Sequence, residues 1–160
     1  MPIRPSTPAD HEAIWAILEP AFSAGESYAI DPDISREDAL EYWLGTDRKS
    51  FVFEQDGAVL GTYYLRTNAG GGGSHVCNCG YITAPAAAGR GIARRMCLHS
   101  LDHARARGYR AMQFNFVVAT NTRAIDLWQT LGFATVGTLP GAFNHPRHGM
   151  VDALVMYQSL

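Results

Sequence analysis

The sequence is poor in lysine, and its net charge is small. Lys49 is the only lysine among 13 basic residues, and the formal net charge at pH 7 is -2. The basic residues form no long run. We therefore do not expect a nucleic acid or an anionic membrane as the main partner, because both are bound through clustered positive charge.

Long apolar stretches are also lacking. No apolar run approaches the ~18 residues that a membrane-spanning helix requires. The first residues, M-P-I-R-P-S-T-P, contain no apolar signal core. The three cysteines are few and odd in number. We expect a cytoplasmic protein with reduced thiols and no membrane partner.

The apolar content is nevertheless sufficient for a core. Of 160 residues, 47% are hydrophobic and 18% are charged. This length and composition are typical of one compact domain. We expect residues 1–160 to form a single domain.

Hydrophobic periodicity predicts the element order βααβββαβαββ, which implies an α+β domain with one mixed sheet. The predicted strands are Ile3–Arg4, Phe51–Gln55, Ala58–Leu65, Val76–Thr83, Met112–Val118, Ala134–Leu139 and Val151–Tyr157. Two helices are predicted to follow caps at Thr7 and Ser35, and two more span Gly91–Gly108 and Asn121–Leu131. The polar residues 140–149 are predicted to form a loop, and Asp56-Gly57 a two-residue hairpin turn.

The stretch A-P-A-A-A-G-R-G-I-A-R-R-M joins a predicted strand to a predicted helix. The free N–H groups of a helix N-terminus bind phosphate, and Gly89 and Gly91 would let a phosphate reach the backbone. Arg90, Arg94 and Arg95 would add positive charge. The alternative is an ordinary tight turn. The residues required by a nucleoside triphosphate loop or a dinucleotide fingerprint are missing.

Together with N-T-R-A-I-D-L-W-Q-T-L-G-F, this loop resembles the GNAT superfamily of acetyl-CoA-dependent N-acetyltransferases. That family's loop reads Gln/Arg-x-x-Gly-x-Gly/Ala, and its second half is matched by Gly91, Ile92 and Ala93. The family's later helix reads Asn-x-x-Ala-x-x-Leu-Tyr-x-x-x-Gly-Phe. Its matching residues here are Asn121, Ala124, Leu127, Gly132 and Phe133.

The resemblance implies a mostly antiparallel, twisted sheet flanked by helices, with two strands splayed around an acetyl-CoA site that uses no metal. It implies a small-molecule amine as acceptor, and a homodimer is an option because relatives often dimerise. The residues that it assigns to acetyl-CoA are Ile82, Thr83, Gly89, Arg90, Gly91, Ile92, Ala93, Arg94, Asn121 and Trp128.

Two positions depart from the family pattern. The leading Gln/Arg of the loop is Ala88, although nearby glycines and arginines still supply a pyrophosphate cradle. The family's frequent general-acid tyrosine falls on Trp128. An indole N–H can donate a hydrogen bond but cannot act as an acid near neutral pH. Another group or solvent must therefore protonate the leaving thiolate, or the thiolate leaves unprotonated.

The stretch S-H-V-C-N-C-G-Y places His75, Cys77 and Cys79 at alternate positions of a predicted strand. Successive members of such a row are about 6.6–7 Å apart. Zinc–ligand distances are ~2.0–2.3 Å, so the three side chains cannot all bind one zinc ion. The same separation disfavours a disulfide between the two cysteines. We expect both cysteines to pack against a helix.

Asn78 lies on the opposite face of the same strand. On Met112–Val118, Gln113 and Asn115 are predicted to share one face, and Phe114 and Phe116 the other. If the splay of the GNAT fold carries over, Asn78 and Asn115 flank the reacting centre as catalytic residues. The alternative is that both amides only satisfy backbone groups at the splay.

Candidates for binding the acceptor are Glu26 and Tyr28, in the loop G-E-S-Y, and Phe116. Alternatively, the two loop residues are only solvated. Asp152 is a further candidate base, or it only pairs with an arginine. His145 and His148 sit in the predicted polar loop, where they could close over the substrate.

The stretches S-H-V-C-N-C-G-Y, M-Q-F-N-F-V-V-A-T-N and V-D-A-L-V-M-Y also resemble a GNAT branch that acts on small molecules, including azetidine-2-carboxylate. The predicted function is acetyl transfer from acetyl-CoA to the primary or secondary amine of a small, amino-acid-like acceptor by direct attack. Backbone N–H groups near Ile82 and Thr83 would polarise the thioester oxygen. The alternatives are a non-catalytic acyl-CoA sensor and a protein or peptide N-acetyltransferase.

Overall fold

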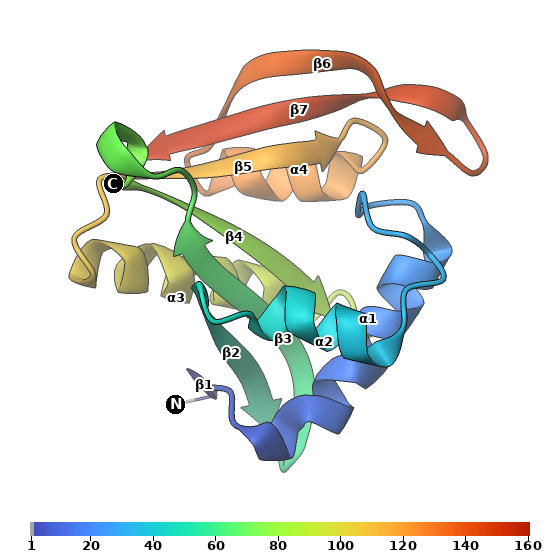
Figure 1. The fold of residues 1–160 in the computed structure, drawn as a ribbon, viewed down its shortest axis with the longest axis vertical. Helices are drawn as coiled ribbons and strands as arrows, with labels where there is room; N and C mark the ends of the chain where they lie inside the picture. The colour runs from blue at the N-terminus through green and yellow to red at the C-terminus, as the bar shows by residue number, and fades with distance from the viewer. Residues whose placement is uncertain (1) are drawn as a thin grey trace.

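The computed structural model describes residues 2–160, and its elements follow the predicted order βααβββαβαββ (Figure 1). The strands are β1 Ile3–Pro5, β2 Arg48–Gln55, β3 Ala58–Thr67, β4 Val76–Thr83, β5 Ala111–Val118, β6 Ala134–His145 and β7 Gly149–Ser159. The helices are α1 His11–Ala24, α2 Arg36–Leu44, α3 Ile92–Ala106 and α4 Thr122–Thr130, with short 3₁₀ helices at Pro8–Asp10, Gly71–Gly73 and Pro85–Ala87. Within residues 2–160 no helix is both long and apolar enough to cross a membrane.

The seven strands form one mixed sheet in the order β1-β2-β3-β4-β5-β7-β6. Every neighbouring pair is antiparallel except β4 and β5, which run parallel. These two strands pair only through Val76 with Ala111 and Cys77 with Met112. Beyond those residues they separate, as Figure 1 shows. The predicted sheet and its splayed pair of strands are therefore confirmed.

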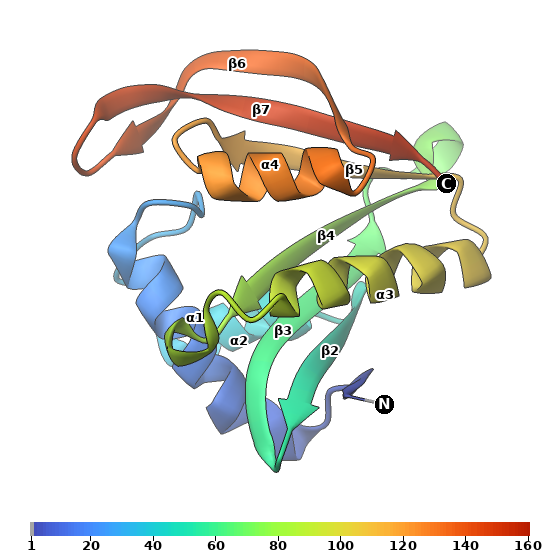
Figure 2. The ribbon, with the colours of Figure 1, turned by 180° about the vertical axis from the view of Figure 1, so that it is seen from behind.

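The helices cover both faces of the sheet. Figure 2 shows α3 and α4 on one side, and α1 and α2 lie on the other. Cys77 and Cys79 are buried in the cluster that includes Met96 and Leu101 of α3, which confirms their predicted packing role. His75 is exposed, and among the described residues no group of three potential ligands could hold a metal ion.

Local signals account for several of the element boundaries. The Ser35 side chain accepts a hydrogen bond from the Asp38 N–H at 3.1 Å and caps α2. Asp56 and Gly57 have φ angles of 53° and 78°. Two consecutive positive φ values define the hairpin turn that matches the twist of antiparallel strands. The predicted hairpin between β2 and β3 is confirmed.

The predicted loop at residues 140–149 is wrong, because most of it is strand. β6 continues to His145 and β7 begins at Gly149, so that only three residues form the turn. A register shift between Leu139 and Phe143 accommodates Pro140. Proline has no N–H to donate, and it is tolerated there because β6 is an edge strand and residues 140–142 have no partner in the register with β7.

Asp10 anchors the start of α1 and carries a first prediction. Its carboxylate accepts hydrogen bonds from the Arg4 guanidinium at 2.8 and 2.9 Å and from the Thr7 N–H at 2.8 Å. The bonds from Arg4 lower the pKa of Asp10 from 3.8 to about 2. Asp10→Asn should therefore lower the free energy of unfolding by up to about 2 kcal/mol at pH 7.

The pH dependence of this difference has a defined sign. A lowered pKa contributes stability above pH 3.8, and that stability is lost as the pH falls through about 2. Urea unfolding of the wild type and of Asp10→Asn should show a difference that shrinks steadily below pH 4. A difference that stays constant from pH 7 to pH 3 would rule out this electrostatic role.

Candidate active site

A cavity of about 700 Å³ occupies the gap between β4 and β5. Its lining comes from α1 and the loop after it, from α2, from β3, β4 and β5, from the first turn of α3, and from α4. The cavity therefore lies where the pairing of β4 with β5 has stopped, and helices from both faces of the sheet contribute to it. We call the part lined by Gly89, Gly91, Arg94 and Arg123, beside α3 and α4, the donor end. The part lined by Tyr42, Tyr64, Arg66, Asn78 and Asn115 is the acceptor end.

The donor end is built around the N-terminus of α3. Gly89 and Gly91 have φ angles of 79° and 75°, a conformation that L side chains rarely adopt. A Cβ at Gly91 would meet no atom within 4 Å, so the backbone there is open to a ligand. The free N–H groups and the positive end of the helix dipole suit a phosphate. Gly89, Gly91, Ile92, Ala93 and Arg94 all line the cavity.

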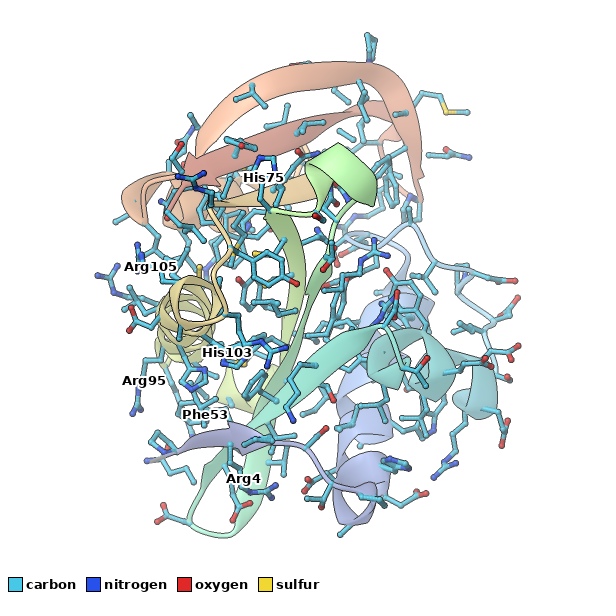
Figure 3. The ribbon with its side chains drawn as sticks, turned by 60° about the vertical axis from the view of Figure 1, so that its left-hand side comes forward. Arg4, Phe53, His75, Arg95, His103 and Arg105 are labelled. Carbon is cyan, nitrogen blue, oxygen red and sulfur yellow. The ribbon has the colours of Figure 1, made fainter. Side chains whose placement is uncertain are left out.

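The arginines beside this loop have different positions. Arg94 lines the cavity, whereas Arg90 and Arg95 are exposed and lie outside the lining. The Arg95 guanidinium instead lies 4.8 Å from the centre of the Phe53 ring, and Figure 3 shows Arg95 beside Phe53. Cation–π stacking therefore removes Arg95 from the predicted charge cluster.

The start of α4 completes the donor end. The Asn121 side chain accepts from the Ala124 N–H at 3.4 Å and caps this helix. Arg123, which the sequence analysis missed, lines the cavity, and its guanidinium is the atom group nearest to a Cβ at Gly89, at 3.9 Å. The sequence could have indicated Arg123, because it lies in the first helical turn after the predicted cap Asn121. Arg123 supplies positive charge that Arg95 does not.

Trp128, on α4, also lines the cavity. Its ring centre lies 5.2 Å from that of Tyr81 and 5.1 Å from that of Phe114. Only 9% of Trp128 is exposed. Trp128 therefore packs with these two rings to form part of the cavity wall.

The backbone of β4 presents alternate N–H groups to the cleft. The Ala84 N–H donates to the Leu60 carbonyl of β3 at 2.8 Å. Because successive strand residues point their N–H groups to opposite sides, the Ile82 N–H also faces β3. The N–H groups of Tyr81 and Thr83 face the separated strand β5. Of the two predicted residues, Thr83 rather than Ile82 is therefore oriented to polarise a carbonyl oxygen in the cleft.

Asn78 is buried where the pairing of β4 with β5 stops. Its Nδ2 donates to the Gln113 carbonyl of β5 at 2.9 Å. Its Oδ1 accepts from Arg66 Nε at 3.2 Å and from the Tyr64 hydroxyl at 3.5 Å. The amide thus bridges the two strands at the splay, and it also lines the cavity.

Asn115 also lines the cavity, at the acceptor end. Its Oδ1 accepts from Gln113 Nε2 at 2.8 Å, and its Nδ2 donates to Asn68 Oδ1 at 2.7 Å. These two bonds fix the orientation of the amide. The hydrogen bond between the side chains of Gln113 and Asn115 agrees with the prediction that they share one face of β5.

The predicted face of Phe116 is wrong. The register of β5 against β7 shifts between Phe114 and Val117, which are both part of the cluster around Trp128. A bulge at this point shifts the alternation by one residue. Phe116 consequently leaves the face of Phe114 and contacts Phe143 of β6, with 6.1 Å between ring centres. It still lines the cavity.

The two candidates in the loop after α1 separate in the structure. Tyr28 lines the cavity and donates its hydroxyl to the Tyr81 carbonyl at 3.1 Å. Glu26 does not line the cavity and instead pairs with Arg147 of the β6–β7 turn at 2.9 Å. Glu26 is therefore held in an ion pair outside the cavity lining, and its contact with the acceptor stays a prediction.

The other predicted bases also lie outside the cavity lining. Asp152 accepts a hydrogen bond from the Gly141 N–H at 2.9 Å and supports the irregular part of β6. His145 is buried, and its Nδ1 accepts from the N–H groups of Arg147 and His148 at 3.1 and 3.3 Å. These groups therefore organise the β6–β7 hairpin.

Across residues 2–160, no aspartate, glutamate or histidine lines the cavity. The available hydroxyl groups are poor acids as well. Loss of contact with water raises the pKa of Tyr28, Tyr64 and Tyr81 well above the ordinary value of 10. Among the described residues, the lining therefore offers neither a carboxylate nor an imidazole for acid or base catalysis near neutral pH.

Several residues at the acceptor end escaped the sequence analysis. Tyr42, Tyr64 and Arg66 line the cavity there. Arg66 pairs with Asn78 in the register of β3 against β4, and a Cβ at Gly80 would lie 2.6 Å from the Tyr64 ring. The sequence indicates that Tyr64 and Arg66 share one face of a strand. It does not specify the register between strands, so it could not place them beside Asn78.

The chain resembles known proteins over most of its length. The sequence model of the "Acetyltransferase (GNAT) family" matches residues 11–133. The N-acetyltransferase aca1 of Schizosaccharomyces pombe is 28% identical over 148 residues, which cover 82% of this chain and 71% of that protein. The structure of a GCN5-related N-acetyltransferase from Kribbella flavida is 42% identical, with a TM-score of 0.94 over 99% of this chain and 96% of that one. The ribosomal-protein-alanine N-acetyltransferase from Brucella melitensis is 25% identical, with a TM-score of 0.87 over 100% of both chains.

Proposed function

Because the chain belongs to the acetyltransferase (GNAT) family and is an acetyl-CoA-dependent N-acetyltransferase, we propose that its acceptor is the amine of a small, amino-acid-like molecule. The observation that carries this proposal is the composition of the acceptor end. It offers two oriented amides and one guanidinium, from Asn78, Asn115 and Arg66, and aromatic rings beside them. Such groups suit a molecule with both a carboxylate and an amine.

The donor end fits the pyrophosphate of acetyl-CoA. The open backbone at Gly91 and the free N–H groups at the start of α3 would bind its oxygens, with Arg94 and Arg123 adding charge. Acetyl-CoA supplies the acetyl group as a thioester. The gap between β4 and β5 would receive the pantetheine arm, so that the thioester meets the acceptor end.

The protein chiefly positions the reacting groups. A neutral amine held beside Asn78 and Asn115 forms a new N–C bond at the thioester carbon. The N–H groups of Tyr81 or Thr83 stabilise the charge that develops on the carbonyl oxygen. The C–S bond then breaks, the amine proton passes to water, and the sulfur leaves as a thiolate. The absence of a carboxylate or imidazole from the described lining agrees with proton loss to solvent.

The three cysteines do not fit a covalent alternative. Cys77, Cys79 and Cys97 are buried, and only Cys79 lines the cavity. Burial raises the pKa of Cys79 well above 9.0 and that of Cys97 to about 12. A thiol is a poor nucleophile, because the thiolate is the reactive form. Direct attack by the amine is therefore the proposed route.

The narrower resemblance to enzymes that act on azetidine-2-carboxylate belongs to the same proposal. Proline and azetidine-2-carboxylate are small secondary amines with an adjacent carboxylate. Their carboxylate and amine suit the amides and the guanidinium of the acceptor end.

Release of the CoA thiol from acetyl-CoA, measured against a panel of acceptors, tests the proposed function. The panel contains amino acids, proline analogues, polyamines and short peptides. We expect turnover with at least one free amino acid or proline analogue, and none with polyamines. Turnover restricted to peptides would replace the proposal by the protein N-acetyltransferase alternative.

A further inference from the structure

We propose that Arg66 is the specificity-determining residue of the acceptor end, and that it selects amines carrying a carboxylate by binding that carboxylate. This inference rests on the proposed function and deepens it. It assigns a role to a residue on β3 that neither of the two sequence motifs includes. It also accounts for the absence of a protein base from the described lining of the cavity.

The guanidinium of Arg66 is oriented by the protein. Arg66 pairs with Asn78 across the β3–β4 ladder, and its Nε donates to Asn78 Oδ1 at 3.2 Å. Asn78 is in turn held by the Gln113 carbonyl at 2.9 Å. Among residues 2–160, the terminal nitrogens of Arg66 make no hydrogen bond. They remain available for a carboxylate, whose two oxygens match two guanidinium N–H groups.

The positive charge of Arg66 is not neutralised by a neighbouring acid. Arg66 takes part in none of the ion pairs formed by the described residues. Asp47, whose pKa Arg66 helps to lower, is bound to Arg48 at 2.9 Å. The other charged residues of the described lining are Arg94 and Arg123, which belong to α3 and α4 at the donor end. Arg48, opposite Arg66 in the β2–β3 ladder, stacks 4.8 Å from the Tyr64 ring, but it is paired with Asp47 and does not line the cavity. Arg66 is thus the cation in the described lining of the acceptor end.

Binding of the carboxylate also affects the reacting amine. A free carboxylate beside an amine favours the ammonium form and raises the pKa of the amine, and the positive charge of Arg66 offsets this effect. A larger fraction of the bound acceptor is then neutral and able to attack. The same charge repels acceptors that carry a second ammonium group, which explains the expected inactivity of polyamines.

A matched pair of acceptors isolates the carboxylate. Acetylation of proline and prolinamide, and of azetidine-2-carboxylate and its carboxamide, is measured as kcat/KM for the wild type and for Arg66→Gln. The wild type should prefer each acid over its amide by about 10- to 100-fold. Arg66→Gln should lose most of that preference, and Arg66→Lys should retain part of it.

Arg107→Gln is the matched control, because it removes the same charge from an exposed position at the end of α3, outside the described lining. It should leave the preference unchanged. The melting temperature and the acetyl-CoA affinity of each variant establish that it is folded. A wild type that acetylates acid and amide equally well, or an Arg66→Gln variant that keeps the full preference, overturns the role of Arg66 while acetyl transfer itself stands.

Calorimetry separates this inference from the proposed function. Proline and prolinamide are titrated into wild-type enzyme saturated with CoA, where no turnover occurs. Tighter binding of proline, lost in Arg66→Gln, supports the role of Arg66 even if neither compound is acetylated. Equal binding of the two compounds, or binding of neither, overturns it.

Discussion

Gly91→Val should weaken acetyl-CoA binding by at least about 100-fold. Two hydrogen bonds from backbone N–H groups to a charged phosphate contribute about 3 kcal/mol or more, and every 1.4 kcal/mol is a factor of ten in affinity. A valine at position 91 would project into the open space beside the helix N-terminus. It would also resist the φ angle of 75° and displace the N–H groups. Calorimetric titration with acetyl-CoA gives the affinity.

Gly57→Val is the control for backbone strain alone. Gly57 has a φ angle of 78°, and no atom lies within 4 Å of a Cβ placed there. It therefore matches Gly91 in conformation and openness but lies in the β2–β3 hairpin, outside the cavity lining. We expect both variants to lose stability and only Gly91→Val to lose affinity. An unchanged affinity in Gly91→Val would mean that the pyrophosphate binds elsewhere.

Asn115→Ala should lower kcat/KM for the acceptor by about 10- to 100-fold and leave the acetyl-CoA affinity unchanged. The amide of Asn115 is fixed by Gln113 and Asn68 at the acceptor end. Its removal takes away a hydrogen bond to the acceptor, and misplacing a reacting group by 1 Å can reduce the rate about 100-fold. Steady-state kinetics with acceptor and acetyl-CoA varied separately distinguish the two effects.

Asn68→Ala separates catalysis from packing. Asn68 does not line the cavity, but its Oδ1 accepts the hydrogen bond from Asn115 Nδ2 at 2.7 Å. If Asn115 acts on the acceptor, Asn68→Ala should have a clearly smaller effect than Asn115→Ala. Equal effects of the two substitutions would indicate that Asn115 serves only the polar network between the strands.

The order of the elements was predictable because each one carries its own periodicity and its own boundary signals. Ser35 and Asn121 cap helices as predicted, and Asp56-Gly57 forms the predicted hairpin turn. The alternation of Asn78 with the buried Cys77 and Cys79 was also predictable, since it depends only on the geometry of a strand. These features are local in the sequence.

Features that depend on distant partners were not predictable. The bulge in β5 arises where β7 fails to match it residue for residue, and it reverses the face of Phe116. The long β6 exists because β7 pairs with it beyond Pro140. Glu26 lies in a polar loop in the sequence, but the arginine that binds it is 121 positions further along the chain, at Arg147.

The acceptor end was only half visible in the sequence for the same reason. Asn78 and Asn115 stood out as polar residues on strands of apolar neighbours. Arg66 resembled an ordinary residue near the end of a strand until the β3–β4 register placed it beside Asn78. The specificity of the site therefore depends on a pairing between strands rather than on a motif.

A crystal structure with CoA and the N-acetylated form of the best acceptor is the most direct test of the central claim. The account predicts the CoA sulfur between β4 and β5, its pyrophosphate at the start of α3, and the product carboxylate on the Arg66 guanidinium. It also predicts the Asn115 amide within hydrogen-bond distance of the product. CoA bound outside this gap, or a product carboxylate directed away from Arg66 and Asn115, would contradict the account.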